Sequence, residues 1–178
     1  MHKTMMTTHR EHKHINNMSD LWRVMMRDFA LLVGLIATSA VFGMTQSIGR
    51  DADDTARSAI RKVIDDQQTA WNRKDLEGFM SGYWNSPELT FFSGARESKG
   101  WQAALDRYKN AYQGAGHEMG KLEFANLRIE MLGADAAFVR GEFHLTMSDG
   151  KTPHGLFTLV FRKFPEGWKI VHDHSAGE

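Results

Sequence analysis

The last stretch of the chain, residues 168–175, constrains the fold most, because it is a β-strand pattern that ends in a polar cluster. It reads Trp-Lys-Ile-Val-His-Asp-His-Ser. Side chains alternate along a strand, which places four of these residues on one predicted face: Trp168, Ile170, His172 and His174. We expect this strand to bury Trp168 in a core and to carry its two histidines into a pocket.

Three more extended segments make most of the second half of the chain β. Residues 122–131, 136–147 and 152–163 are separated by short turns that contain glycine and aspartate. In the first segment, the apolar residues change parity near Ala125 and Asn126, which predicts a β-bulge. A series of long antiparallel strands with a bulge is predicted to curl.

The first half of the folded region is predicted to be mainly helical. Apolar residues recur at helical spacing over residues 55–71, 76–83 and 101–112, and a short strand is predicted at 89–92. Asp53 and Asp54 are expected to cap the first helix. The fold class is therefore α+β: a cone-shaped, curved antiparallel sheet with three N-terminal helices that enclose a cavity. We expect this domain to span residues 55–178.

The start of the chain is predicted to lie outside the domain. Residues 1–28 are polar and lack an apolar period, so a disordered leader is expected there. Residues 29–49 carry no charge, which predicts a signal peptide or, alternatively, an uncleaved membrane anchor. Residues 50–54 are expected to be a linker. The protein is thus expected to be periplasmic or secreted, with an inner-membrane anchored form as the alternative, and to contact a membrane only through residues 29–49.

Composition excludes several classes of function. The 22 Lys and Arg residues balance 22 Asp and Glu residues, so the chain lacks the positive surplus that binding nucleic acid requires. The absence of cysteine excludes disulfides, thiol catalysis and iron–sulfur ligation. The pair His172 and His174 is a weak metal signal, because no carboxylate or motif-length spacing accompanies it. We predict no metal and no other cofactor.

Three segments resemble a known family. Residues 70–77, at the junction of the first two predicted helices, resemble the nuclear transport factor 2-like superfamily, which includes SnoaL-like and ketosteroid isomerase-like domains. Residues 136–140 and 168–177 are similar to the association domain of calcium/calmodulin-dependent kinase II. The resemblance covers residues 55–177 and implies a cystatin-like fold, a cavity and a habit of forming oligomers. It implies no reaction, because this fold hosts many functions.

The resemblance does not extend to the catalytic residues of ketosteroid isomerases. The positions of their base, their second aspartate and their tyrosine correspond here to Ser93, Leu159 and Gln67. Ser93 cannot serve as a base near neutral pH, so isomerase chemistry of that kind is not supported. The association domains line their cavity with arginines, and the resemblance places Arg140 at one of these positions.

Ten residues are predicted to line the cavity and to bind a ligand. Arg140 is expected to hold a carboxylate, unless Glu142 pairs with it. The alternative for this strand is an ordinary solvated face. Aromatic residues are expected to belong to the core and partly to rim the cavity. The full set is Trp71, Tyr83, Phe92, Trp101, Tyr108, Arg140, Glu142, His144, His172 and His174.

We therefore predict an exported protein that binds a small molecule, with Arg140 holding a small acid. One alternative is an enzyme, either a lyase, an isomerase or a hydrolase, that uses His172 or His144 as acid or base. Another is an oligomerisation module like the association domain. A homodimer is expected across the strand face that carries Val139, Phe143, Leu145 and Met147, since exposed apolar faces mark interfaces.

Overall fold

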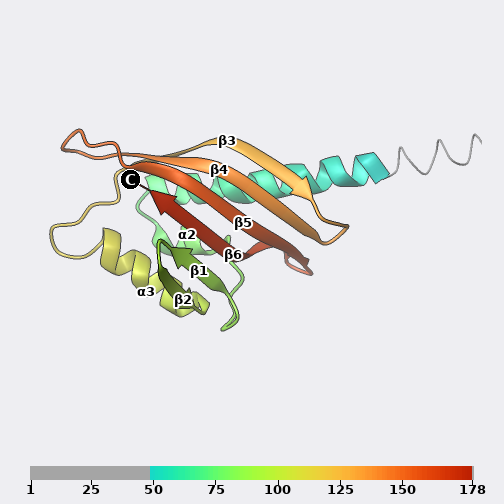
Figure 1. Cartoon of the computed structure of the whole chain (residues 1–178), viewed down its shortest axis with the longest axis horizontal. Coiled ribbons are helices and arrows are strands. Elements are labelled where there is room, and N and C mark those ends of the chain that lie inside the picture. The colour runs from blue at the N-terminus through green and yellow to red at the C-terminus, as the bar shows by residue number, and fades with distance from the viewer. Residues whose placement is uncertain (1–48, 178) are drawn as a thin grey trace, which may run out of the picture. The chain divides into compact units, whose positions relative to one another are not determined.

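The structure is a computed structural model that describes residues 49–177. Its elements, in chain order, are a long helix over residues 49–72, α2 (Leu76–Met80), β1 (Thr90–Ser93), β2 (Arg96–Lys99), α3 (Trp101–Tyr112), β3 (Lys121–Met131), β4 (Ala136–Thr146), β5 (His154–Phe164) and β6 (Gly167–Gly177). Figure 1 shows β3 to β6 as long neighbouring ribbons, with the long helix behind them. Among residues 49–177, no helix is long and apolar enough to cross a bilayer.

The six strands form one sheet in the order β2-β1-β6-β5-β4-β3. All eight elements of the predicted α+β architecture are confirmed: three helices, the short strand β1 and the four long strands. The sheet is mixed, however, because β1 pairs in parallel with β6, whereas an entirely antiparallel sheet was expected. Strand β2 was not predicted, since its sequence, Arg-Glu-Ser-Lys, is polar. Polar, charged residues are typical of a short strand at the edge of a sheet.

The long helix begins earlier than the sequence pattern predicts. Residues 50–54, the predicted linker, are helical, and Asp53 and Asp54 lie inside the helix instead of capping it. The Thr55 hydroxyl donates to the carbonyl oxygen of Asp51, four residues back, as helical geometry allows. The leader at residues 1–28, and the apolar segment as far as residue 48, lie outside the described residues and stay predictions.

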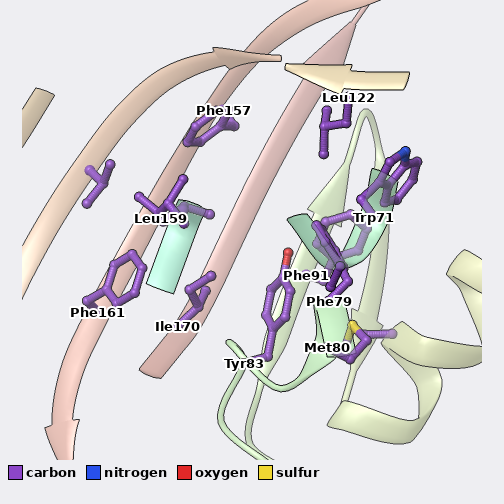
Figure 2. Packing of buried hydrophobic residues seen from close by; sticks show 14 of the residues in the cluster. Trp71, Phe79, Met80, Tyr83, Phe91, Leu122, Phe157, Leu159, Phe161 and Ile170 are labelled. Atoms are coloured by element: carbon purple, nitrogen blue, oxygen red, sulfur yellow. The ribbon is translucent and has the colours of Figure 1, made fainter. Parts of the chain in front are cut away.

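The core lies between the helices and one face of the sheet. On β4 this inner face carries Ala137, Val139 and Leu145, all at most 4% exposed. Figure 2 shows Phe157, Leu159 and Phe161 along one strand, with Trp71, Phe79, Tyr83 and Phe91 across from them. The predicted burial of Trp168 is confirmed, since only 5% of its surface is exposed.

This packing corrects the surface proposed for a homodimer. Val139 and Leu145 belong to the same apolar cluster as Ile60 and Ile64 of the long helix, so helices of the same chain cover that face. The prediction was wrong about the face because it assumed that the helices would leave part of it exposed. The homodimer itself stays a prediction.

Two β-bulges shape the sheet. The one predicted near Ala125 and Asn126 is confirmed, because the pairing of β3 with β4 shifts between Ala125 and Arg128, and Asn126 has a positive φ of 52°. The other was not predicted. The pairing of β5 with β6 shifts where Phe161 faces Ile170 and Val160 faces His172, which leaves Val171 as an extra residue.

Candidate functional site

A cavity of about 160 Å³ lies between the sheet, the long helix, α2 and α3. An engineered apolar cavity of about 150 Å³ in another protein binds benzene, so this one has room for a single ring. Its walls are mainly apolar or aromatic: Ile64, Trp71, Phe79, Tyr83, Phe91, Tyr108, Ala111, Tyr112, Leu122, Phe124, Phe143, Leu145, Phe157 and Leu159. The other lining residues are Gln67, Ser93, Arg107, Asp173, Ser175 and Gly177.

Asp173 is the most unusual group in the cavity. Its side chain comes from β6 and the residue is only 3% exposed. One carboxylate oxygen accepts a hydrogen bond from the Tyr83 hydroxyl at 2.7 Å, and the other accepts one from Ser175 Oγ at 2.7 Å. None of the ion pairs found within residues 49–177 includes Asp173. Burial raises the pKa of this carboxyl to about 6, so both its forms are populated near neutral pH.

Two tyrosine hydroxyls connect Asp173 to the cavity. The hydroxyl oxygens of Tyr83 and Tyr108 are 3.4 Å apart. Burial, followed by the charge of Asp173, holds the pKa of both tyrosines well above the usual value, so both remain protonated donors. The Tyr83 hydroxyl donates to Asp173. Tyr108 is half-buried and lines the cavity. Tyr108 can therefore donate to Tyr83 or to a bound ligand.

The aromatic wall is held by directional contacts. The Trp71 ring meets Phe79 and Tyr112 edge to face, with ring centroids 5.2 and 4.8 Å apart. Trp71 Nε1 donates to the carbonyl oxygen of Met119 at 2.9 Å, which ties the end of the long helix to the segment before β3. On the sheet side, Gly141 leaves room for Phe157, because a Cβ there would lie 2.5 Å from that ring. The cavity is thus preformed.

The bulge in β6 decides which residues enter the cavity. Trp168 and Ile170 face inward, and the extra residue Val171 changes the alternation so that Asp173 also faces inward. His172 and His174 therefore lie on the outer side of the sheet. The prediction that these histidines share a face with Ile170 is wrong, because it assumed an unbroken alternation.

His172 instead contacts residues of β1. Its Nδ1 is 2.6 Å from Thr90 Oγ1, and its ring packs edge to face on Phe92. Burial, together with the nearby charge of His174, lowers the pKa of His172. Phe92 was also predicted in the cavity; the structure places its neighbour Phe91 there instead. Neither histidine lines the cavity, so an enzyme with a pocket histidine as acid or base is not supported.

The predicted polar group on β4 lies on the outer face as well. Arg140 is 49% exposed along its side chain and pairs with Glu130 at 3.0 Å. His144 Nε2 is 3.4 Å from a Glu142 carboxylate oxygen on the same face. The cavity takes the apolar residues of this strand, including Leu145, which leaves the polar residues to the solvent. The expectation that Arg140 holds a ligand in the cavity is wrong, and the alternative of a solvated face is correct.

Three of the predicted residues do line the cavity: Trp71, Tyr83 and Tyr108. Trp101 does not line it, and donates instead from Nε1 to the carbonyl oxygen of Met80 at 3.0 Å. Asp173 was missed because it lies between two histidines in a polar stretch, where an unbroken alternation assigns it to the outer face. Among residues 49–177, no group of three or more histidine and acidic side chains is arranged to hold a metal ion.

Comparisons with known proteins agree with this geometry. A family model of the SnoaL-like domain matches residues 60–176. Among solved structures, a nuclear transport factor 2-like protein of unknown function from Shewanella oneidensis MR-1 is 36% identical, with a TM-score of 0.63, and the match covers 67% of this chain and 98% of that one. A search of curated proteins found no match.

Two more distant structures share the fold. A nuclear transport factor 2-like superfamily protein from Salmonella enterica is 24% identical, with a TM-score of 0.60 and coverage of 70% of this chain and 92% of that one. A hexachlorocyclohexane dehydrochlorinase from Novosphingobium barchaimii LL02 is 20% identical, with a TM-score of 0.59 and coverage of 71% and 89%. Similarity to the association domain stays a prediction. The chain belongs to the SnoaL-like domain family, within the nuclear transport factor 2-like superfamily.

Proposed function

We propose that this protein binds a small molecule with a single ring in its cavity and moves a proton to or from it through Asp173. One observation carries the proposal: a buried carboxyl with a pKa of about 6 lies in an aromatic cavity and is held by Tyr83 at 2.7 Å. A general base works best when its pKa is close to the working pH. Perturbed carboxyls in clefts are typical of active sites.

The surroundings of Asp173 support catalysis over simple binding. A buried charge without a cationic partner is destabilising, and an asparagine could make similar hydrogen bonds to Tyr83 and Ser175 without that cost. Carboxylates kept in such surroundings usually have a chemical task. The dehydrochlorinase of the same fold supports the idea that this architecture accommodates reactions of small ring compounds.

The proposed reaction begins with removal of a proton from a carbon beside a carbonyl group. The C–H bond breaks, its electron pair moves into the enolate, and a carboxylate oxygen of Asp173 takes the proton. The enolate oxygen gains negative charge, which the hydroxyl of Tyr108 can stabilise by donating a hydrogen bond. Asp173 then returns the proton to the same or another carbon. An isomerase is therefore favoured over a hydrolase. A lyase would share the first step, but the electron pair of the enolate would then expel a leaving group from the β-carbon instead of taking the proton back.

Deuterium exchange tests this proposal without knowledge of the natural substrate. The protein is incubated in D₂O with cyclohexanone or phenylacetone, each of which has a single ring, and loss of the proton signal beside the carbonyl is followed by NMR. We expect exchange above the buffer rate for at least one ketone. Asp173→Asn should slow it by about 10²- to 10⁴-fold, which is the usual contribution of a general base.

The matched control for this experiment is Asp106→Asn. Asp106 is an exposed acid on α3 that accepts a hydrogen bond from Gln102, so its loss should leave exchange unchanged. Exchange by the wild type at the buffer rate for every ketone would contradict the proposal. Equal exchange by the wild type and Asp173→Asn would show that another group is the base.

The homodimer predicted from the sequence is also proposed, on the outer face of the sheet. Leu156 of β5 is 66% exposed there, between residues of both charges that include Arg140 and Glu142. A two-fold axis through this face would cover Leu156 with Leu156 of the second copy and bring acidic side chains of one copy close to basic side chains of the other. Light scattering should give the mass of two chains, and Leu156→Asp should lower it to one. A wild-type mass of one chain at micromolar concentration would contradict the dimer.

A further inference from the structure

We infer that Arg107 is a second polar anchor in the cavity and that the ligand is a small carboxylic acid with one ring. Its carboxylate would bind the guanidinium of Arg107, while its ring fills the aromatic space. The placement of the reactive carbon beside Asp173 rests on the function proposed above. The binding of the acid by Arg107 does not, because it follows from separate contacts.

Arg107 comes from α3 and lines the cavity one residue before Tyr108. Its guanidinium carbon lies 5.3 Å from the centre of the Phe91 ring. Its charge lowers the pKa of Tyr108 and of Tyr112, against the stronger effect of burial, so it acts on both rings of this wall. The residue is half-buried and lines the cavity, so its charge is only partly solvated.

This cation has no acidic partner within residues 49–177. None of the ion pairs found there includes Arg107, whose guanidinium lies over the Phe91 ring. Lys109, on the same helix but outside the cavity, does have an acidic partner, Glu77, at 3.4 Å. A half-buried guanidinium beside an apolar space is matched best by a carboxylate, which can accept two parallel N–H bonds from it.

Arg107 is also not the counter-ion of Asp173. Apart from burial, the groups that act on the pKa of Asp173 are Tyr83, Ser175 and the charge of His174. The cavity therefore has a cationic group on α3 and a separate acid on β6, and aromatic side chains line the same space. An acid bound at Arg107 avoids repulsion by Asp173. The volume of about 160 Å³ leaves room for one ring in the cavity that both residues line.

Calorimetry with phenylacetate and its neutral isostere phenylacetamide tests the inference. We expect the wild type to bind phenylacetate about 10- to 100-fold more tightly, the range for hydrogen bonds to charged groups. Arg107→Met should remove this preference, and Arg107→Lys should keep part of it. Lys109→Met removes the same charge from α3 outside the cavity and should keep all of it. Circular dichroism checks that each variant is folded.

Asp173→Asn separates this inference from the proposed function. That variant should bind phenylacetate at least as tightly as the wild type, because a negative charge is gone, even where deuterium exchange is lost. Acid preference without exchange would overturn only the proton transfer, and exchange without acid preference would overturn only the role of Arg107. The role of Arg107 also fails if neither compound binds, or if Lys109→Met and Arg107→Met weaken binding equally.

Discussion

Asp173→Asn is expected to stabilise the protein at neutral pH by about 2–3 kcal/mol, although it removes the proposed base. The pKa of this carboxyl is raised from 3.8 to about 6 in the folded protein. Each pKa unit corresponds to about 1.4 kcal/mol, so ionised Asp173 lowers the free energy of unfolding by at most about 3 kcal/mol. An asparagine keeps an acceptor for Tyr83 and gains a donor for Ser175 without the buried charge.

The sign follows from proton linkage. Between pH 4 and pH 6 the folded protein holds a proton on Asp173 that the unfolded chain has released, so stability falls as pH rises through this window. The difference between the variant and the wild type should therefore be small near pH 4 and reach its full value above pH 7. Other acids act in the opposite direction, as the lowered pKa of Glu142 shows, so only this difference isolates Asp173.

Urea unfolding at pH 4.5 and pH 7.5 measures the free energy of unfolding of the wild type and of Asp173→Asn, and shows how their difference changes with pH. The control is again Asp106→Asn, which should follow the wild type at both values. A variant that is less stable than the wild type at pH 7.5 would mean that the carboxylate of Asp173 is favourable where it lies. Greater stability together with lost exchange would place Asp173 among residues that serve activity at a cost in stability.

Trp71→Ala is expected to lower the free energy of unfolding by about 3–5 kcal/mol, the range for truncation of a large buried aromatic side chain. The residue is 3% exposed, and its ring meets Phe79, Tyr108 and Tyr112 edge to face. Each such aromatic pair adds about 0.5–1.5 kcal/mol beyond the burial of its area. The substitution also leaves the carbonyl oxygen of Met119 without its donor.

Thermal unfolding tests this expectation, with Trp84→Ala as the matched control. Trp84 is half-buried and stacks on Phe164 with ring centroids 5.3 Å apart, so its loss should cost about 1–2 kcal/mol. Indole should raise the melting temperature of Trp71→Ala, since it fits the space that the side chain leaves. A melting temperature equal to that of the wild type would mean that the aromatic wall does not support the fold.

The sequence predicts the long strands well because their alternation is a local property. The bulge near Asn126 can be predicted in the same way, because the apolar residues before and after it differ in parity. The parallel pair of β1 and β6 is not readable, because it joins segments about eighty residues apart whose pairing depends on the completed sheet. Polar β2 has no apolar pattern to detect.

The site was predicted less well than the fold, and the same physical reason explains the errors on β4 and on β6. Alternation assigns residues to two faces but does not say which face the helices cover. On β4 the polar face of Arg140 was assigned to the cavity, whereas burial of Val139 and Leu145 decides otherwise. On β6 the bulge at Val171 reverses the faces partway along the strand. Trp71 and Tyr108 were placed correctly because each lies on the apolar face of its helix, whereas Tyr83 lines the cavity from the segment after α2.

Because of the bulge in β6, the number of residues in this strand decides which side chain is the proposed acid–base group. In an uninterrupted strand, His172 and His174 would follow Ile170 into the interior and Asp173 would face the solvent. With Val171 as an extra residue, the carboxyl lies inside and the imidazoles outside. An ancestor of this fold could thus exchange a histidine for an aspartate in its cavity by inserting or deleting one residue, without substituting either side chain. In comparisons between relatives, the register of the last strand therefore carries as much functional information as the residues in it.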